Sequence, residues 1–472
     1  MSSEHITETM SGVDAAWLHM EEPTNLMMVA GILHFSTRIN RQDLVDVVIQ
    51  RILQYPRFHQ RVVDDSSLRA PHWEDVETLD MDYHLQDLTL PAPGDKATLQ
   101  QAVGELLSQP LDFEHPLWQA HLIDTGNGDS VLMMRIHHCI ADGIALISVL
   151  MKITGDSPEA SLATTKSEPT KLHEEHGVLD NLYRQATGVL TTASKTVEMI
   201  AHESVETIKH PERLMDWFRL GTESVSKTAD ILFQSSDPET IFKGPLGVTK
   251  KVAWSNPIPL DDIKAIRVET NSTVNDVLIS ILAGSLRRYL QTHNQSTDDL
   301  TIRTLVPVNL RPPQDTVHLG NHFGLVFLEL PLGIADPVER IQDVKAHMDA
   351  IKSSPEAYVA LGMLKVLGHT PAEIQRFVLD KLSTKATAVM TNVPGPQQPI
   401  YCVGQELKSI MFWVPMSARL GLGVSILSYN GTVRLGVNCD AGLIPDPDAI
   451  IDGFAEEFQA TLAVFQKPAQ KD

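Results

Sequence analysis

The sequence predicts an α/β fold made of two related units joined by a helical connection. Segments typical of strands alternate with segments of helical periodicity in both halves of the chain. The 472 residues exceed the length of one ordinary domain. Residues 155–171 are rich in Ser, Thr, Pro, Glu and Lys, and helical periodicity returns after them. We therefore expect one domain at 1–154, a linker and helical connection at 155–245, and a second domain at 246–472.

The first half contains capped helices and a hairpin. Ser11 and Asn40 are suitable caps for two helices, with a strand between them at 26–35. Apolar runs at 118–124 and 131–136 flank a Gly-Asn-Gly-Asp sequence, which predicts two strands joined by a tight turn. The second of these strands leads through two histidines into another apolar run, at 144–150, long enough to begin a helix.

The second half repeats this alternation. Ser272 and Thr273 are suitable caps for a helix whose apolar residues from Val274 to Leu282 fit one face. Asn430-Gly431 is a hairpin turn signal. We expect strands at 301–308, 323–330, 386–391, 407–415, 421–428 and 432–439, and helices at 337–352, 357–367 and 446–465.

The helical connection has apolar faces of its own. Residues 197–208 and 214–232 show helical periodicity, and packing on the two domains is the expected role of their apolar faces. An alternative is that Leu214, Trp217 and Phe218 contact lipid, as interfacial amphipathic helices do.

Composition narrows the class of protein. Hydrophobic residues make up 43% and charged residues 21%, an ordinary composition for a soluble globular protein. With 38 Lys and Arg against 60 Asp and Glu, the net charge is −22, which argues against nucleic acid as a partner. Any contact with an anionic membrane surface must then be mainly apolar or local.

The location expected from the sequence is the cytoplasm. The first ten residues lack a cationic segment followed by an apolar core, so no signal peptide is expected. The apolar runs are too short to span a bilayer. The three cysteines form no CxxC motif, which favours a reducing compartment. Nothing in the sequence indicates the oligomeric state.

The heptapeptide from His137 to Gly143 carries the strongest chemical signal. Successive strand side chains point to opposite faces, so His137 and His138 cannot both face one cleft. One is expected to react and the other to support it. A neutral imidazole can accept a proton from a hydroxyl near neutral pH, which indicates a general base. Asp142 follows four positions after His138, and Gly143 permits a tight turn or the close approach of a substrate.

Two other interpretations of this pair remain open at this point. A His pair at a strand end is often only a structural or surface feature. The pair could also bind a metal with Cys139 or Asp142, since all three side-chain types are ligands. The opposed strand faces and the lack of a second Cys/His cluster argue against the metal.

The spacing His-His-x-x-x-Asp-Gly resembles the signature of the CoA-dependent acyltransferase superfamily, which includes chloramphenicol acetyltransferase and peptide-synthetase condensation domains. Four further stretches occur in order along the chain: Pro116-Leu117-Trp118, Gly244-Pro245-Leu246-Gly247, Asn275-Asp276 and Asn392-Val393-Pro394-Gly395-Pro396. Together they resemble the bacterial wax ester synthase/diacylglycerol acyltransferase family over nearly the whole chain.

The resemblance implies two chloramphenicol-acetyltransferase-like domains with mixed sheets that meet at an active-site channel. It implies acyl transfer from long-chain acyl-CoA to a fatty alcohol, giving a wax ester, or to diacylglycerol, giving triacylglycerol. His138 is the expected general base, and His137, Asp142 and Gly143 are expected to orient the site. Acyl-CoA is then a substrate, and no metal or cofactor is expected because a thioester is already activated. The lipid substrates of the family also imply peripheral contact at the inner membrane or lipid inclusions.

Other residues are expected to support the site. The resemblance implies that Asp142 pairs with an arginine, for which Arg61 is our first choice and Arg57 the second. Asn275 and Asp276 match a family motif near the channel, but helix capping alone also explains them. Asp14 and Trp118 are further candidates. A helix-start carboxylate and a core anchor are the ordinary alternatives for these two residues.

Two rival functions remain at this point. A condensation-type acyltransferase would take its acyl group from a carrier protein, but the acidic charge disfavours an acidic carrier. A non-catalytic lipid-droplet-binding protein with a vestigial site is the second rival, and the intact histidine motif argues against it.

Overall fold

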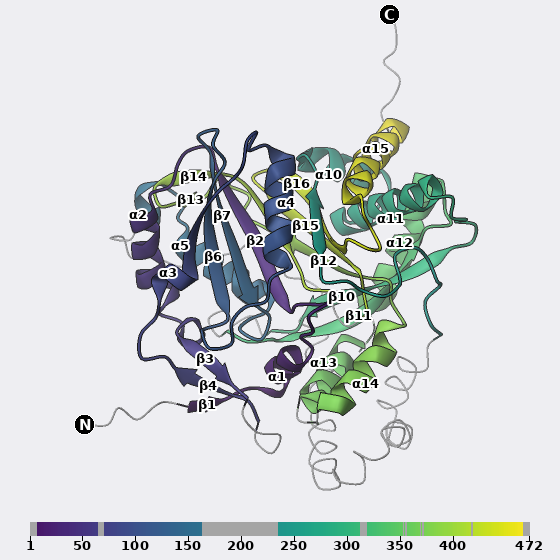
Figure 1. The fold of residues 1–472 in the computed structure, drawn as a ribbon. Helices are drawn as coiled ribbons and strands as arrows, with labels where there is room; N and C mark the ends of the chain where they lie inside the picture. Colours follow the sequence, from purple (N-terminus) through teal and green to yellow (C-terminus); the bar gives the residue numbers. More distant parts are fainter. Residues whose placement is uncertain are drawn as a thin grey trace, which may run out of the picture.

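The structure is a computed structural model that describes residues 7–64, 70–162, 235–311, 319–352, 354, 356–368, 370, 372–416 and 419–465. Two large sheets lie side by side with helices around them, and a small sheet adjoins the first (Figure 1). The predicted mixed α/β architecture is confirmed, because each large sheet combines parallel and antiparallel pairs.

The first sheet has six strands in the order β13-β14-β2-β7-β6-β5. Its centre is antiparallel, and only the pair of β5 with β6 is parallel. The predicted hairpin is present, with glycines at positive φ in its turn. The strands are β2 (Met28–Phe35), β5 (Leu85–Thr89), β6 (Trp118–Asp124), β7 (Ser130–His137), β13 (Tyr401–Cys402) and β14 (Gln405–Trp413).

The second sheet has seven strands in the order β11-β10-β12-β15-β16-β8, with β9 also pairing with β16. β12 is parallel to both of its neighbours. Asn430 and Gly431 both have positive φ in the turn between β15 and β16, as the hairpin signal predicts. The strands are β8 (Lys250–Trp254), β9 (Ile258–Pro259), β10 (Thr301–Asn309), β11 (Phe323–Pro331), β12 (Ala388–Pro394), β15 (Leu422–Tyr429) and β16 (Thr432–Asp440).

Helices cover the sheets and form most of the remaining structure. Helix α15 packs on α11, β16 and β8, while α13 packs between α1 and β11. The longer helices are α1 (Gly12–His19), α4 (Lys96–Leu107), α5 (Gly143–Ile153), α10 (Leu260–Glu269), α11 (Val274–Thr292), α12 (Pro337–Lys352), α13 (Glu356–Leu367), α14 (Ala372–Ser383) and α15 (Pro447–Phe465).

The small sheet and several short helices complete the first half. The small sheet has the order β1-β4-β3, formed by β1 (Thr7–Thr9), β3 (Gln60–Val63) and β4 (His72–Asp75). The predicted helix after Asn40 begins as α2 (Arg41–Val47) and continues as the π-helical turn η1 (Val48–Ile52). The other short helices are α3 (Met81–His84), η2 (Pro56–Phe58) and η3 (Glu159–Ser161).

The two sheets are not built from two separate stretches of chain. Strand β14 lies far along the sequence, yet it pairs with β2 at the edge of the first sheet. Gly155 forms a bridge with Tyr401 beside it. The predicted boundaries at 154/155 and 245/246 remain predictions, but the first sheet is completed only by residues from the second half.

The start of the predicted linker is ordered against this added strand pair. Residues 159–161 form a short helical turn, and the buried Ser161 hydroxyl accepts a hydrogen bond from the Gly404 backbone N–H at 2.7 Å. Thus the first residues of the predicted linker, 155–162, are held against the strand pair β13-β14. The rest of that linker and the predicted amphipathic helices at 197–208 and 214–232 lie outside the described residues.

No helix in the described part of the chain is both long enough and apolar enough to cross a membrane.

Candidate active site

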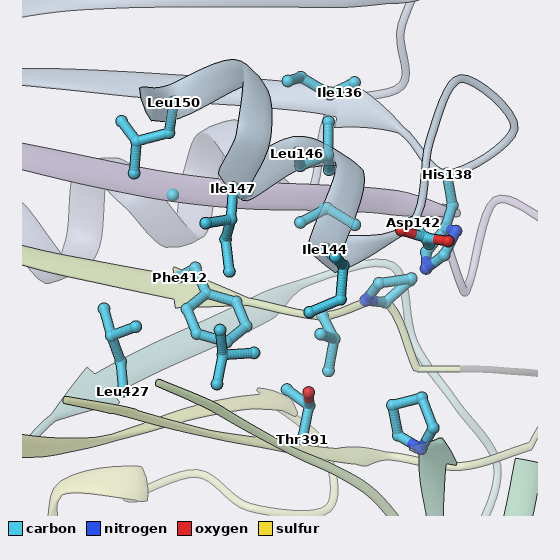
Figure 2. Close-up of a pocket in the computed structure, with 18 of the residues that line it drawn as sticks. Ile136, His138, Asp142, Ile144, Leu146, Ile147, Leu150, Thr391, Phe412 and Leu427 are labelled. Atoms are coloured by element: carbon cyan, nitrogen blue, oxygen red, sulfur yellow. The ribbon is translucent and has the colours of Figure 1, made fainter. Parts of the chain in front are cut away.

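The two histidines lie where the central strand of the first sheet ends. Strand β7 ends at His137, and helix α5 begins at Gly143 with Asp142 as its N-cap. The Asp142 Oδ1 atom accepts the Ala145 backbone N–H at 2.9 Å, which fixes the turn between strand and helix. The apolar face of α5 then runs away from this turn along a cavity (Figure 2).

The cavity has a volume of about 300 Å³ and lies where the two sheets meet. Figure 2 shows His138 and Asp142 together at one end, with Leu146, Ile147 and Leu150 extending along α5. Strands of both sheets form the other walls, and most of the lining is apolar. A cavity of this kind accommodates hydrocarbon, because burial of each CH₂ group is worth about 0.8 kcal/mol.

His138 is buried against aromatic rings at this end of the cavity. Its ring stacks on Trp17, with centroids 4.2 Å apart and planes at 14°. Its Nδ1 atom lies 2.9 Å from the Asn321 side-chain oxygen. Burial lowers the pKa of His138 to about 4, although the nearby Asp142 carboxylate opposes the shift. The imidazole is therefore neutral near pH 7.

His137 points to the opposite side of the strand, as the alternation of side chains predicts. Its Nε2 atom lies 2.9 Å from the Glu21 carboxylate, and its Nδ1 atom accepts the Cys139 backbone N–H at 3.1 Å. Glu21 also accepts the Met27 backbone N–H at 3.1 Å. His137 therefore supports the turn, and only His138 reaches the cavity.

Asp142 is held by a cation from the second half of the chain. The Arg311 guanidinium lies 3.0 Å from Asp142 Oδ2, and both side chains are buried. The same oxygen accepts the His322 backbone N–H at 2.9 Å. With both carboxylate oxygens occupied, Asp142 is a structural anchor for the turn.

The choice of Arg61 as the partner of Asp142 is wrong. Arg61 forms ion pairs with Glu74 at 2.9 Å and Glu114 at 3.1 Å in the small sheet region. Arg57, the second choice, lies closer to the site, where it pairs with Asp14 at 3.0 Å and donates to the Ile140 carbonyl at 3.0 Å. The error arises because the true partner, Arg311, is distant in sequence.

Asp14 joins the site through Asn321. Its Oδ1 atom accepts from the Asn321 backbone N–H at 3.1 Å and from the Asn321 side-chain amide at 2.7 Å. Asp14 is almost fully buried. The carboxylate in the first turn of α1 is thus more than a favourable helix-start charge, although it does not line the cavity.

The remaining predicted site residues lie in the cavity, beside it or in the core. Gly143 lines the cavity. Asn275 is exposed and lies outside the cavity lining, but it accepts a hydrogen bond from Asn392, a cavity residue, at 2.8 Å. Asp276 is buried in a capping box with Thr273, so capping accounts for its contacts. Trp118 is a core anchor, since it donates to the Phe58 carbonyl at 2.9 Å and lies outside the main cavity.

A smaller apolar cavity of about 50 Å³ adjoins the main one. The two share Trp17 and Leu325 in their walls. Ala360 and Met363 of α13 line this second cavity. The side chain that stacks on His138 therefore also faces a second apolar space.

Sequence reasoning missed four residues of the site: Trp17, Glu21, Arg311 and Asn321. The three-residue spacing of Asp14 and Trp17 places them on one face of α1, which is a usable signal. The other three residues carry no local signal that separates them from ordinary surface residues.

Two family models match the chain. The wax ester synthase/diacylglycerol acyltransferase catalytic domain matches residues 10–278, and the C-terminal domain of the same family, WS/DGAT, matches residues 319–461. The chain belongs to this family. It is thus an acyl-CoA-dependent acyltransferase, which confirms the resemblance that the ordered motifs indicated.

Individual WS/DGAT relatives span nearly the same length. One relative from Mycobacterium tuberculosis, named a diacylglycerol O-acyltransferase, is 26% identical over 96% of this chain and 90% of its own. Another from the same species, tgs1, is 23% identical over 91% of this chain and 89% of its own.

Solved structures share the fold. The wax ester synthase/diacylglycerol acyltransferase from Marinobacter aquaeolei has a TM-score of 0.66 at 21% identity, covering 97% of this chain and 99% of its own. The first condensation domain of the calcium-dependent antibiotic synthetase has a TM-score of 0.61 at 13% identity, covering 98% of this chain and 97% of its own. The condensation domain therefore shares the fold of this chain.

Proposed function

We propose that this WS/DGAT family member transfers a long-chain acyl group from acyl-CoA to the hydroxyl of a diacylglycerol or a fatty alcohol, with His138 as the general base. The observation that carries the proposal is a neutral, buried imidazole at one end of an apolar cavity of about 300 Å³. Relatives named diacylglycerol O-acyltransferases support diacylglycerol as one acceptor.

The proposed reaction begins with proton transfer to His138. Among the described residues, no hydrogen bond occupies the His138 Nε2 atom, while Nδ1 faces Asn321. The Nε2 lone pair takes the hydroxyl proton as the acceptor oxygen attacks the thioester carbonyl carbon. The resulting tetrahedral intermediate expels CoA thiolate as the C–S bond breaks, and the imidazolium returns its proton to the thiolate.

The negative oxygen of the intermediate needs hydrogen-bond donors that are already in position. The cap of α5 uses the Ala145 N–H and leaves the N–H groups of Gly143 and Ile144 without an intrahelical acceptor. Both residues line the cavity. We assign the oxyanion to this helix start, where the helix dipole also favours negative charge, with Asn275 as the alternative donor.

Two adjoining apolar cavities fit two hydrocarbon substrates. The main cavity along α5 suits the acyl chain, and the smaller one beyond Trp17 suits part of the acceptor. A thioester is activated enough that this chemistry uses no protein nucleophile, metal or cofactor. We also propose a peripheral contact with a membrane or lipid inclusion, which would supply such substrates.

The test is an acyl-transfer assay with the purified protein. Palmitoyl-CoA is offered with hexadecanol and with diacylglycerol separately, and free thiol release is followed together with the ester product. Release with either acceptor supports the proposal, and the ratio gives the balance between wax ester and triacylglycerol. Release only from a carrier-bound acyl group would favour a condensation-type enzyme.

Replacing His138 with Ala tests the assigned base. Loss of a positioned base typically costs about 10² to 10⁴ in rate, so turnover should nearly vanish while binding of acyl-CoA persists. His115→Ala is a suitable control, because this histidine stacks on Tyr83 away from the cavity. Near-normal turnover by the His138 variant would remove the mechanism. Binding without any turnover by the unaltered protein would support a non-catalytic lipid-binding role.

A further inference from the structure

The side chain of Asn321 forms hydrogen bonds that join His138 to Asp14. Its amide nitrogen lies 2.7 Å from Asp14 Oδ1 and 2.8 Å from the backbone carbonyl of His138. Its oxygen lies 2.9 Å from His138 Nδ1. All of these groups are buried, so water does not compete for these hydrogen bonds.

The surroundings decide which end of the amide faces the ring. A carboxylate and a carbonyl can only accept hydrogen bonds, so the atom between Asp14 and the His138 carbonyl must be the NH₂ donor. Asp14 is itself fixed, because its other oxygen pairs with Arg57 at 3.0 Å and the Asn321 backbone N–H also donates to it. The Asn321 oxygen is therefore directed at His138.

An amide oxygen that faces Nδ1 requires a proton on that nitrogen, and a hydrogen bond from the ring to the backbone of His138 itself favours the same tautomer. Since the buried imidazole is neutral, it carries one proton, and a proton on Nδ1 leaves Nε2 with the lone pair. Stacking on Trp17 holds the plane of the ring. We propose that Asn321 is a positioning residue that keeps His138 in the Nδ1–H tautomer, so that Nε2 is the basic nitrogen in the cavity.

This inference rests on the proposed role of His138 as base and extends it to the second half of the chain. Asn321 lies beside Gly320, whose carbonyl accepts from the Asp142 backbone N–H at 3.3 Å and from Arg311 at 2.9 Å. The same short segment thus holds the motif's aspartate and its histidine. The first half alone lacks the contact that holds His138 in this tautomer, so the segment with Asn321 must dock on it.

The test reads the tautomer directly. Long-range ¹⁵N–¹H correlation spectra of protein labelled at the histidine ring nitrogens distinguish protonated from unprotonated nitrogens. The His138 signals are assigned by their absence from the spectrum of His138→Gln. We expect a protonated Nδ1 in the unaltered protein and a mixture of tautomers in Asn321→Leu. The kcat of Asn321→Leu should fall by about 10²-fold, with KM for palmitoyl-CoA close to the unaltered value.

A second variant covers the case in which Asn321→Leu does not fold. Asn321→Asp keeps an acceptor of the same shape, so the Nδ1–H tautomer should persist. The second oxygen of this aspartate takes the place of the amide nitrogen, 2.7 Å from Asp14 Oδ1, so the two carboxyl groups must share a proton and no new charge faces the ring. The kcat of Asn321→Asp should therefore stay near the unaltered value, whereas a mixture of tautomers in this variant would overturn the role of Asn321. Asn438→Leu, which replaces another buried asparagine outside the cavity, is the matched control.

The outcomes separate this inference from the proposed function. A proton on Nε2 in the unaltered protein, or an unchanged tautomer in Asn321→Leu, would overturn the role of Asn321 even if the enzyme transfers acyl groups. Absence of acyl transfer by the unaltered protein would overturn the proposed function, while the spectra would still report which nitrogen Asn321 selects.

Discussion

At the scale of single residues, burial sets the chemistry of the histidine pair. Both rings are almost fully buried, but their partners differ: His137 faces a carboxylate, and His138 faces a neutral amide. An amide can fix the orientation of a ring without adding a charge that would favour protonation. His138 is therefore kept both oriented and uncharged, which is the state in which an imidazole acts as a base.

The pH profile should report this uncharged state. The pKa of His138 is lowered to about 4 by burial, so the basic form is present at every pH above that value. Asp142 raises this pKa and His137 lowers it further, and both are included in the shift. We expect kcat/KM to be limited by His138 only near pH 4. A decline centred on pH 6.5, the value of a solvent-exposed histidine, would contradict the burial argument.

The Arg311–Asp142 pair predicts an asymmetric response to substitution. Removing one partner of a buried ion pair costs about 3 to 5 kcal/mol, since an uncompensated charge remains. We expect Arg311→Met to lower the free energy of unfolding by that order, measured with urea. The double variant Arg311→Met/Asp142→Asn should recover part of the loss, because no buried charge is left. Equal stability of the single and double variants would mean that the unpaired Asp142 carboxylate is not what destabilises Arg311→Met.

At the scale of elements, the turn into α5 brings the proposed base and the proposed oxyanion donors together. Asp142 caps α5, whose first residues Gly143 and Ile144 line the cavity, and the ion pair with Arg311 holds that cap. The sequence predicts this helix start from local signals, since a cap, a glycine and an apolar run lie within a few residues. The cavity wall opposite α5 depends on strands from elsewhere in the chain.

Substitution of Gly143, at this helix start, should change turnover without impairing folding. A methyl group at this position would meet no atom within 4 Å, and the backbone does not require glycine. We expect Gly143→Ala to fold with unchanged or slightly higher stability, because alanine favours helix by roughly 0.5 to 1 kcal/mol. Turnover should fall, because the methyl group occupies the place where the thioester carbonyl approaches in the proposed mechanism.

A second glycine provides the matched control for this variant. At Gly247, outside the cavity, an added methyl group would lie 3.9 Å from the Asp440 carboxylate, an ordinary contact. Gly247→Ala should leave turnover unchanged. Thermal denaturation measures the stability of both variants, and initial rates measure their turnover. If Gly143→Ala is fully active, the proposed oxyanion site at α5 is wrong.

At the scale of the whole molecule, the second half completes the sheet and the site of the first. The second half supplies β14 to the first sheet and the segment that holds Asp142 and Asn321 to the site. Unpaired strand edges and large exposed apolar surfaces are both unfavourable in isolated domains. The site and the fold therefore depend on the same contacts between the halves.

Expression of the predicted domains as separate chains tests this dependence. Residues 1–154 would leave β2 without β14 at its edge and open the cavity to water. We expect 1–154 and 246–472 each to aggregate or to lack a cooperative thermal transition, and co-expression to restore a soluble complex. Size-exclusion chromatography and circular dichroism would measure this. Two monomeric fragments that each melt cooperatively would show independent domains.

The sequence by itself determined the family, most elements and the histidine that we propose as the base. Strand β6 and helix α12 were predicted to the residue, because periodicity and flanking signals depend only on near neighbours. Only the tertiary structure decided the partners of the motif. Arg311 lies 169 residues from Asp142, and Asn321 lies 183 residues from His138. Contacts at such separation depend on how the whole chain folds, and no local pattern in the sequence records them.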